Sequence, residues 1–290
     1  MKILATVHVF YPEFWPQLAR CLGNVGAPCD VVATLPEGAP FADDIRRDFP
    51  AARILPCENR GFDVWPFLRA LGEAGLDGYT HVLKLHTKRD VHTDPPTFFN
   101  DFDYEGPRWR DALLSFVADG TSFEKCRALF ARDPSVAMVA GRDVIVRRRD
   151  VEHPDVRRTF DEALAYAADE FGIRPARPEF VAGTMFMARA DVFRPFLGRF
   201  SAADFAPSAK DDRVVTRAHL LERALGFAAC AAGRIADPDD SMRLRHLRSD
   251  AARAAKAVRR FLLQTKTTRS GARITKICRI PVWHSRKERQ

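Results

Sequence analysis

The chain has 290 residues, of which 46% are hydrophobic and 29% charged, an ordinary composition for a globular protein. This length suits one large α/β domain or two small ones. No run of about 18 apolar residues is present, so we expect no transmembrane helix. The first ten residues form a strand-like run without a signal-peptide pattern, which favours a first strand over a cleaved leader.

The six cysteines are scattered along the chain without a CxxC pair. Their spacing argues against a zinc site or a disulfide framework and is typical of reduced thiols in the cytoplasm. These residues are Cys21, Cys29, Cys57, Cys126, Cys230 and Cys278.

The net charge of +8 belongs to the end of the chain. From Arg243 onward there are 15 Lys and Arg against Asp250 and Glu288, which gives +13 and leaves −5 for the preceding 242 residues. We therefore expect an acidic domain with a basic tail. Nucleic acid is an unlikely ligand of the domain, because no RRM, OB or helix-turn-helix pattern is present.

Apolar periodicity predicts alternating strands and helices in the first 90 residues, which is typical of a parallel sheet with crossover connections. The strands are predicted at 3–10, 29–35, 53–56 and 81–86, and the helices at 12–25, 41–49 and 63–72.

Helices dominate the middle of the chain. We predict helices at 109–118, 122–132, 156–171 and 217–226, and strands at 136–141, 179–188 and 227–233. Gly183 interrupts the strand predicted at 179–188. No linker forces a boundary before about residue 240, so we predict an α/β domain at 1–240 and a basic helical tail at 241–290.

A strand predicted at His81–Leu85 runs directly into His86, Lys88, Arg89 and Asp90. Ligands of open α/β sheets bind just past the carboxyl ends of strands, and cationic groups there suit a phosphate or diphosphate. The plainer alternative is a strand that leaves the core into a solvated basic turn.

A second polar cluster lies upstream and contains Asn59, Gly61 and Asp63. Gly61 can adopt a positive φ or admit a ligand close to the backbone, and the two polar side chains can bind sugar hydroxyls or base edges. Asp63 is also a plausible helix N-cap, so the alternative is turn and cap chemistry alone.

Five segments together resemble the rhamnan synthesis F family of bacterial polysaccharide glycosyltransferases. They are VHVFYPEFW, ENRGFDVWPFL, HVLKLHTKR, FVAGTMFMARADVF and HLLERALGF, and they span about residues 3 to 235. The resemblance implies a GT-A-like fold with an open, mostly parallel sheet flanked by helices. It also implies a hexosyltransferase that moves a sugar such as rhamnose from a nucleotide-diphosphate donor to a lipid-linked polysaccharide such as O-antigen.

The resemblance also suggests roles for individual residues. Donor-binding residues are expected at Phe10, Asn59, Gly61, Asp63, His86, Lys88 and Arg89, and residues lining a sugar at Gly183, Thr184 and Met185. The catalytic base is placed at Glu222, with Asp211, Asp212 and His219 as alternatives. A bulge at Gly183 and an ion pair between Glu222 and Arg223 are the structural alternatives.

Many GT-A enzymes hold a divalent cation with an Asp-x-Asp motif, but the corresponding strand end here reads His86-Thr87-Lys88. We therefore predict no metal cofactor, with the cationic side chains neutralising the diphosphate. The alternative is Mg²⁺ or Mn²⁺ held by Asp63 or Asp90.

The missing acidic pair also favours a second function, a noncatalytic nucleotide-sugar or glycan-binding module. The basic tail suggests a peripheral protein on the anionic cytoplasmic face of the cell membrane, where a lipid-linked acceptor would lie. Packing of the tail onto the domain and nonspecific nucleic-acid contact are its alternatives.

Overall fold

The computed structural model describes residues 1–90, 98–99, 102–103, 106–151, 154–208, 215–241, 247, 251, 258, 263–267, 273–277 and 280–285. The chain divides into two compact units, residues 1–240 and 241–290. Within the described part of the chain, no helix combines the length and hydrophobicity that a membrane span requires.

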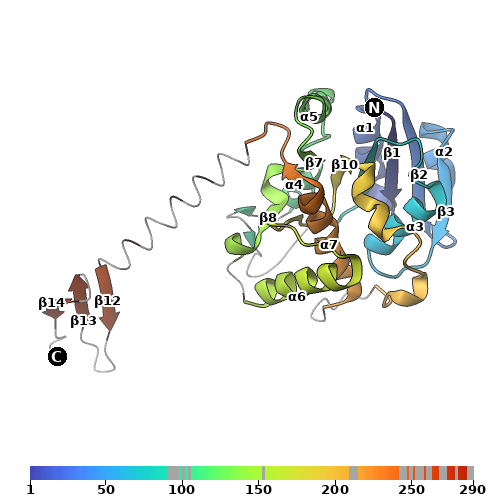
Figure 1. The fold of residues 1–290 in the computed structure, drawn as a ribbon. Helices are drawn as coiled ribbons and strands as arrows, with labels where there is room; N and C mark the ends of the chain where they lie inside the picture. Colours follow the sequence, from blue (N-terminus) through green and yellow to red (C-terminus); the bar gives the residue numbers. More distant parts are fainter. Residues whose placement is uncertain are drawn as a thin grey trace. The chain divides into compact units, whose positions relative to one another are not determined.

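A seven-stranded sheet forms the centre of the first unit, with strand order β11-β7-β10-β4-β1-β2-β3 (Figure 1). β10 runs antiparallel to both neighbours, and the remaining neighbouring pairs are parallel. The strands are β1 (Ile3–His8), β2 (Cys29–Pro36), β3 (Arg53–Cys57), β4 (His81–His86), β7 (Val136–Val139), β10 (Phe186–Arg189) and β11 (Arg234–Ala236). The predicted α/β class with an open, mostly parallel sheet is confirmed.

Helices flank this sheet, with α3 packed on β1 and β2 and α7 packed on β7 and β11. The helices are α1 (Trp15–Gly23), α2 (Ala42–Asp48), α3 (Val64–Ala74), α4 (Arg108–Leu114), α5 (Gly120–Arg132), α6 (Pro154–Phe171) and α7 (Arg217–Ala232). Short 3-10 helices lie at η1 (Pro12–Phe14), η2 (Arg142–Val144), η3 (Arg148–Asp150), η4 (Ala190–Phe196) and η5 (Ala202–Asp204).

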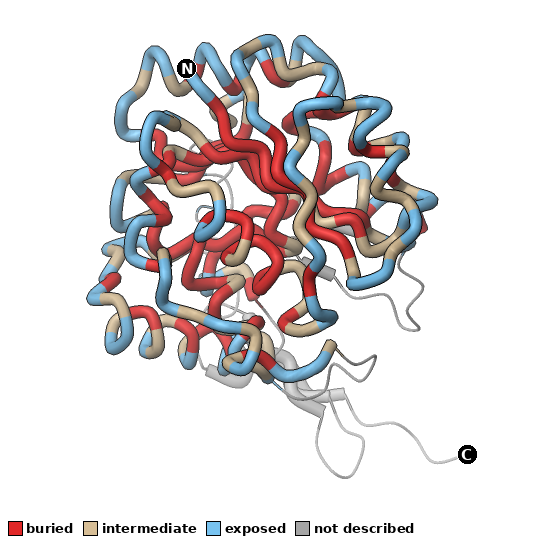
Figure 2. Tube along the Cα trace, turned by 90° about the vertical axis from the view of Figure 1, so that its right-hand side faces the viewer, coloured by how far each residue is buried: buried red, intermediate tan, exposed pale blue. Residues whose placement is uncertain are grey.

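The central strands are buried because helices cover the sheet, and Figure 2 shows them as a continuous buried layer. β1 is apolar along most of its length, as expected for a parallel strand buried on both faces. β4 has the same burial, yet it contains Lys84 at 1% exposure. A buried ammonium requires hydrogen-bond or ion-pair partners, and the partners of Lys84 form the site described below.

Two strand predictions in the middle of the chain are wrong in detail. The predicted strand at 227–233 is the second half of α7, because its alanine-rich sequence favours helix. The predicted strand at 179–188 is two strands, β9 (Glu179–Val181) and β10, separated by a turn at Gly183 and Thr184. β9 pairs with β8 (Ile145–Arg147) outside the main sheet, and β5 (Phe98–Phe99) pairs with β6 (Phe102–Asp103).

The second unit contains strands that the predicted basic helical tail did not include. It contains an antiparallel sheet of β12 (Leu263–Thr267), β13 (Arg273–Ile277) and β14 (Ile280–Ser285). The physical reason is the alternation of Ile, Val and Thr with polar residues from position 263 onward, a period-2 pattern that favours strands. Most of residues 251–262, and Cys278, lie outside the described residues.

Two helix-interior glycines give a matched test of this packing. A Cβ at Gly226 in α7 would lie 2.5 Å from Phe180 Cα, whereas a Cβ at Gly72 in α3 would meet nothing within 4 Å. We expect Gly226→Ala to destabilise the protein by about 1–3 kcal/mol through overpacking. Gly72→Ala should stabilise it by about 0.5–1 kcal/mol, because alanine loses less backbone entropy. Chemical denaturation measures both, and equal effects would contradict the close contact of α7 with β9.

Candidate functional site

A buried lysine lies at the centre of the site. Lys84 Nζ contacts the Asp63 carboxylate and donates to the Thr184 carbonyl at 3.0 Å and the Thr184 hydroxyl at 2.7 Å. An ammonium has three donors, so these contacts use all of them. Lys84 thereby joins the start of α3 to the turn before β10, two segments about 120 residues apart in sequence.

Asp63 occupies the N-cap position of α3, but its side chain makes no capping hydrogen bond. Its Oδ2 instead accepts from Lys84 and from the Thr184 hydroxyl. Burial alone would raise the pKa of Asp63, but His86 and Lys84 beside it, with these hydrogen bonds, hold that pKa below its usual range. Burial lowers the pKa of Lys84, and Asp63 opposes this shift. The two side chains form a salt bridge at 2.5 Å, and cap chemistry alone does not explain Asp63.

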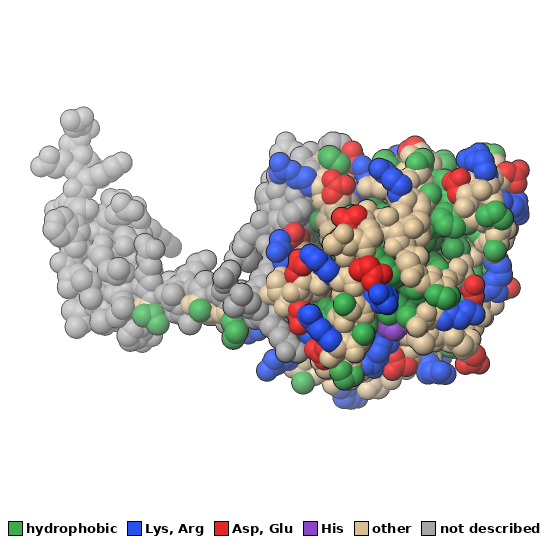
Figure 3. Space-filling view, turned by 90° about the horizontal axis from the view of Figure 1, so that it is seen from above, with side chains coloured by type: hydrophobic (Ala, Val, Ile, Leu, Met, Phe, Trp, Pro, Cys, Tyr) green, Lys and Arg blue, Asp and Glu red, His purple; other side chains and the backbone are tan. Residues whose placement is uncertain are grey.

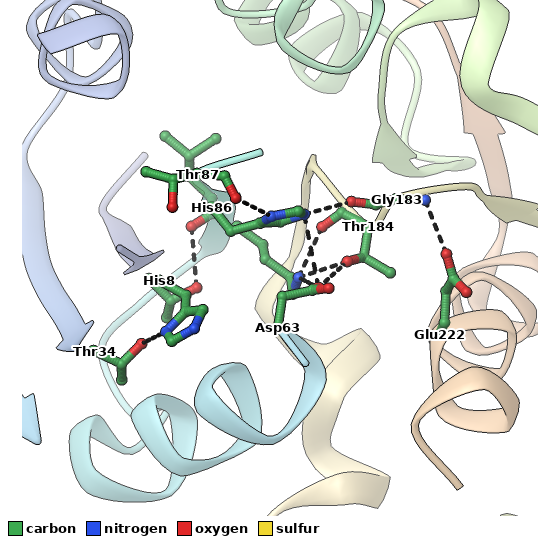
Figure 4. A network of polar contacts seen from close by, with 11 residues as sticks. His8, Thr34, Asp63, His86, Thr87, Gly183, Thr184 and Glu222 are labelled. Carbon is green, nitrogen blue, oxygen red and sulfur yellow. Dashed lines mark hydrogen bonds and ion pairs between the residues drawn. The ribbon is translucent and has the colours of Figure 1, made fainter. Parts of the chain in front are cut away.

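Hydrogen bonds with side chains of β4, α7 and the residue before α3 hold the turn at Gly183 and Thr184 (Figure 4). The Gly183 N–H donates to Glu222 Oε1 at 2.9 Å, and the Gly183 carbonyl accepts from His86 Nε2 at 2.7 Å. Thr184 has a φ of 49°, a left-handed conformation that costs a β-branched residue about 1–3 kcal/mol. Such strain persists only where surrounding bonds hold it, and here Lys84 and Asp63 supply them.

The sugar-lining residues expected at this turn are enclosed by the protein. Gly183 has a φ of 74°, and a Cβ there would lie 2.7 Å from Leu113. Met185 and Thr184 are buried at 0% and 1% exposure. Packing and backbone conformation therefore explain the glycine, and the structure does not support a direct sugar contact by these side chains.

Two histidines lie beside the ion pair, His86 buried and His8 half-buried. Burial is the main cause that lowers the pKa of His86, and it lowers the pKa of His8 to about 3, with His86 adding to the effect. Both ring nitrogens of His86 face carbonyl oxygens, Nε2 at 2.7 Å from Gly183 O and Nδ1 at 3.2 Å from Thr87 O, and a neutral ring can donate to only one of them. His8 Nδ1 lies 3.0 Å from the Thr34 hydroxyl. His86 thus faces inward, which corrects the expectation that it contacts the diphosphate.

The carboxyl ends of β1 and β4 are tied together by Thr87. Its hydroxyl oxygen accepts from the backbone N–H groups of Phe10 and Tyr11, both at 2.9 Å. Phe10 is half-buried, and its ring meets that of Tyr11 edge-on with centroids 4.9 Å apart. This bond fixes two neighbouring strand ends as one rigid edge, where the sequence predicted a ligand site.

Two cations of this edge differ in their surroundings. The Arg89 guanidinium stacks on the Tyr11 ring at 4.3 Å and lies 3.7 Å from Glu13 Oε1. Lys88 is half-buried, and its ammonium has no hydrogen-bond or ion-pair partner among the residues that the structure describes. Within the described part of the chain, Lys88 is therefore the cation of this edge whose ammonium is not engaged by another side chain.

The turn predicted at Asn59, Gly61 and Asp63 is held by residues 205–208. Gly61 N–H donates to Ala206 O at 3.1 Å, Phe62 N–H to Ser208 Oγ at 2.8 Å, and Ser208 N–H to Asn59 O at 3.0 Å. A Cβ at Gly61 would lie 2.6 Å from the Phe205 ring. Asn59 is exposed, and Phe62 has a φ of 55°, a second strained residue next to Asp63.

The base candidates lie on or just before α7. Besides its bond to Gly183, Glu222 lies 3.3 Å from Arg223, whose guanidinium stacks on Phe180 at 4.9 Å. His219 Nδ1 accepts the Thr216 N–H at 3.1 Å, so this nitrogen is occupied by helix capping. Asp211 and Asp212 lie outside the described residues.

A narrow recess beside the ion pair holds about 160 Å³ of space between atoms. Its lining includes Thr6, His8, Thr34, Asp63 and Lys84. The recess has no room for a water molecule, so it is not a small-molecule pocket of the usual roughly 300–1,000 Å³. In the described residues, no group of three His, Cys, Asp or Glu could hold a metal ion.

Sequence reasoning overlooked Lys84, His8 and Thr34. The signal for Lys84 was present, because a charged residue inside an apolar strand buried on both faces must have a buried partner. His8 and Thr34 carried no comparable signal, since a polar residue at the end of a strand is ordinary.

Removing one charge of the buried pair should be costly. Lys84→Met leaves Asp63 buried without its cation, and we expect a loss of about 3–5 kcal/mol at neutral pH. Because the pKa of Asp63 is lowered, the pair stabilises the fold above the ordinary carboxyl pKa, and this contribution is lost as pH falls. Lys84→Met/Asp63→Asn should recover much of the loss. Urea unfolding at several pH values measures this.

Lys2→Met is the matched control, because the Lys2–Asp30 pair is about half exposed at 49% and 50%. It should change the free energy of unfolding by less than about 1 kcal/mol. A similarly small effect of Lys84→Met would show that Asp63 and Lys84 are not an ion pair.

A family model and two curated proteins match the first part of the chain. The model of the family described as Rhamnan synthesis protein F matches residues 1–234. Two curated proteins, both named Uncharacterized protein WxcX and from Xanthomonas campestris pv. campestris strains B100 and ATCC 33913, are 26% identical over 235 residues. The match covers 78% of this chain and 31% of each relative, so the chain spans less than a third of their length.

A solved structure of 4-diphosphocytidyl-2C-methyl-D-erythritol synthase is also similar, with a TM-score of 0.34 and 14% identity over 77% of this chain and 97% of that chain. A likeness this weak identifies no shared activity. The family match covers most of the first unit, including Lys84, Asp63 and Glu222. The chain belongs to the rhamnan synthesis protein F family.

Proposed function

We propose that residues 1–240 form a GT-A-like glycosyltransferase domain that acts in the synthesis of a bacterial surface polysaccharide. The donor is a nucleotide-diphospho-sugar, with rhamnose or another deoxyhexose as the sugar. The acceptor is a lipid-linked glycan. Family membership supports a role in polysaccharide synthesis, and the site geometry supports the transfer chemistry.

The observation that carries the proposal is the half-buried Lys88 at the carboxyl end of β4, which lacks an ion-pair partner among the described residues. A cation held at a strand end and left open is suited to a diphosphate. Thr87 fixes this strand end to that of β1, so Lys88 projects from a rigid edge. The donor would lie across this edge near Phe10, Asn59, Asp63 and Arg89.

The transfer would proceed by attack of an acceptor hydroxyl oxygen on the anomeric carbon of the donor sugar. The bond from that carbon to the diphosphate breaks, and the hydroxyl proton passes to a carboxylate. We place this base at Glu222, which the Gly183 N–H orients from the same turn that Lys84 holds. Lys88 would neutralise charge on the leaving diphosphate.

The carboxylates that could recruit a divalent cation are already engaged by protein cations. Asp63 binds Lys84, and Asp90 binds Arg110. These pairs favour donor binding without Mg²⁺ or Mn²⁺. The same lack of an acidic pair also favours the second candidate, a noncatalytic nucleotide-sugar or glycan-binding module.

Lys88→Ala should weaken donor binding by about tenfold or more, because a charge-assisted contact with the diphosphate is lost. Thermal shift and calorimetry with a panel of nucleotide-diphospho-sugars, each with and without EDTA, measure this. Lys125→Ala is the control, since Lys125 is exposed and pairs with Asp239 at 2.7 Å. Unchanged affinity in Lys88→Ala contradicts the role of Lys88, and binding that disappears in EDTA contradicts metal independence.

Glu222→Gln keeps the size of the side chain and removes its basicity. If Glu222 deprotonates the acceptor, turnover should fall by about 10²-fold or more while donor affinity changes little. Sugar transfer to an extracted lipid-linked acceptor measures this. Near-normal turnover in the variant would move the base to another carboxylate, and donor binding by a parent that never turns over would favour the binding module.

We also propose that the second unit holds the protein on the cytoplasmic face of the cell membrane. Residues from Arg243 carry +13, while the preceding part carries −5. Figure 3 shows Lys and Arg interspersed with Asp and Glu on one face of the described domain. Each basic residue near an anionic surface contributes about 1 kcal/mol of attraction, so the tail supplies the membrane affinity.

Vesicle flotation tests this attachment. We expect the full chain to float with vesicles that contain anionic lipid and to be released by salt, because salt screens the charges. Removal of residues 249–290 should abolish flotation and leave donor binding intact. Equal flotation of the full and shortened chains would contradict a role of the tail.

A further inference from the structure

The buried Lys84 connects two strained turns without reaching the surface. Its ammonium contacts Asp63 beside one turn and binds Thr184 in the other. Each turn contains one non-glycine residue with a left-handed backbone, Phe62 with a φ of 55° and Thr184 with a φ of 49°. Left-handed conformations of bulky residues persist only where the surrounding structure holds them. At 1% exposure, Lys84 cannot itself touch a ligand.

The two oxygen atoms of Asp63 have different surroundings. Oδ2 accepts from Lys84 and Thr184 and lies 3.8 Å from His86 Nε2. Oδ1 has no hydrogen-bond partner among the described residues, and 19% of the side chain is exposed. An ionised carboxylate has further acceptor sites on the second oxygen, and a sugar hydroxyl is a suitable donor for them.

We propose that Lys84 is a positioning residue that fixes Asp63 so that its Oδ1 accepts a hydrogen bond from a hydroxyl of the donor sugar. The proposal rests on the function proposed above, because it assumes a nucleotide-diphospho-sugar at the strand ends. Lys84 acts through Asp63 and makes no contact with the donor. The bonds from Lys84 to Thr184 fix the turn that orients Glu222, so one side chain sets both halves of the site.

Other titratable groups around Asp63 bear on any pH effect. His86 lies on β4, His8 on β1 and Glu222 on α7, while Lys88 follows β4. His86 is buried and His8 half-buried, and burial lowers the pKa of both histidines. His86 and Lys84 both lower the pKa of Asp63, and Lys84 also donates a hydrogen bond to its carboxylate.

The test compares Lys84→Met, which removes the charge, with Lys84→Arg, which keeps it. The first measurement is NMR titration of ¹³C-labelled aspartate carboxyl groups, with Asp63 assigned by its absence in Asp63→Asn. In the parent and in Lys84→Arg, Asp63 should titrate below the usual range. In Lys84→Met, Asp63 should titrate above the usual range of a carboxyl group, because burial raises its pKa and the charge of Lys84 no longer opposes this shift. Lys2→Met, which removes an exposed Lys–Asp pair, should match the parent.

The second measurement is the pH dependence of affinity for the nucleotide-diphospho-sugar that the parent binds in the panel. Lys84→Met should lose about tenfold or more in affinity as pH falls through the raised pKa of Asp63, because the protonated carboxyl is a poorer acceptor. Lys84→Arg should restore the parent profile. If Lys84→Met does not fold, Lys84→Gln replaces it, because glutamine removes the charge and keeps hydrogen-bond donors.

The proposal is overturned if the charge-removed variant binds the donor as the parent does at every pH, or if Asp63 titrates as in the parent. These outcomes differ from a failure of the proposed function. If the proposed function fails, the parent binds no nucleotide-sugar of the panel. A shifted titration of Asp63 in Lys84→Met would then still support the positioning of Asp63 by Lys84.

Discussion

A lysine ammonium enclosed in a protein core imposes a strict requirement, because its desolvation must be offset by charge and hydrogen bonds. In this domain the requirement falls on Lys84, in the middle of a buried strand. Its partners come from the start of α3 and from the turn that precedes β10. The buried charge therefore fixes the position of two loops that the sheet topology alone would leave free to vary. Glu222 and His86 are then oriented by the second of these loops.

The strand ends form a second, connected part of the site. Thr87 follows β4 directly and holds the backbone after β1, so the edge that carries Lys88 is continuous with the sheet. In the proposed function this rigid edge binds the diphosphate through Lys88, and little backbone ordering would remain to oppose binding. The arrangement places fixed charge inside the protein at Lys84 and accessible charge outside at Lys88.

Periodicity predicted most of the sheet, because long apolar strands and amphipathic helices carry strong local signals. It failed where tertiary contacts decide the structure. The run from Phe227 continues a helix through its alanines. The apolar run at 179–188 breaks at Gly183, where the interruption was predicted, but no local pattern revealed the left-handed backbone of Thr184. The strands after residue 263 show the same limit, since a basic composition concealed their period-2 alternation.

Motif order located the elements of the candidate site but not the contacts between them. The strand end at Lys88 and the turn at Asp63 follow from motif order, but the contact between Asp63 and Thr184 spans 121 residues and required the fold. His86 was expected to face a ligand and instead binds the Gly183 carbonyl inside the protein. Sequence spacing could not reveal this inward orientation, because a residue at a strand end can face either side.

The central claim is that a nucleotide-diphospho-sugar binds across the carboxyl ends of β1 and β4. A crystal structure of the protein with the tightest-binding nucleotide-diphospho-sugar tests it most directly. We expect the diphosphate to lie within hydrogen-bond distance of Lys88 and a sugar hydroxyl to donate to Asp63 Oδ1. The contact between Lys84 and Asp63 should remain intact. A donor bound elsewhere on the domain, or one whose diphosphate lies away from Lys88, would contradict it.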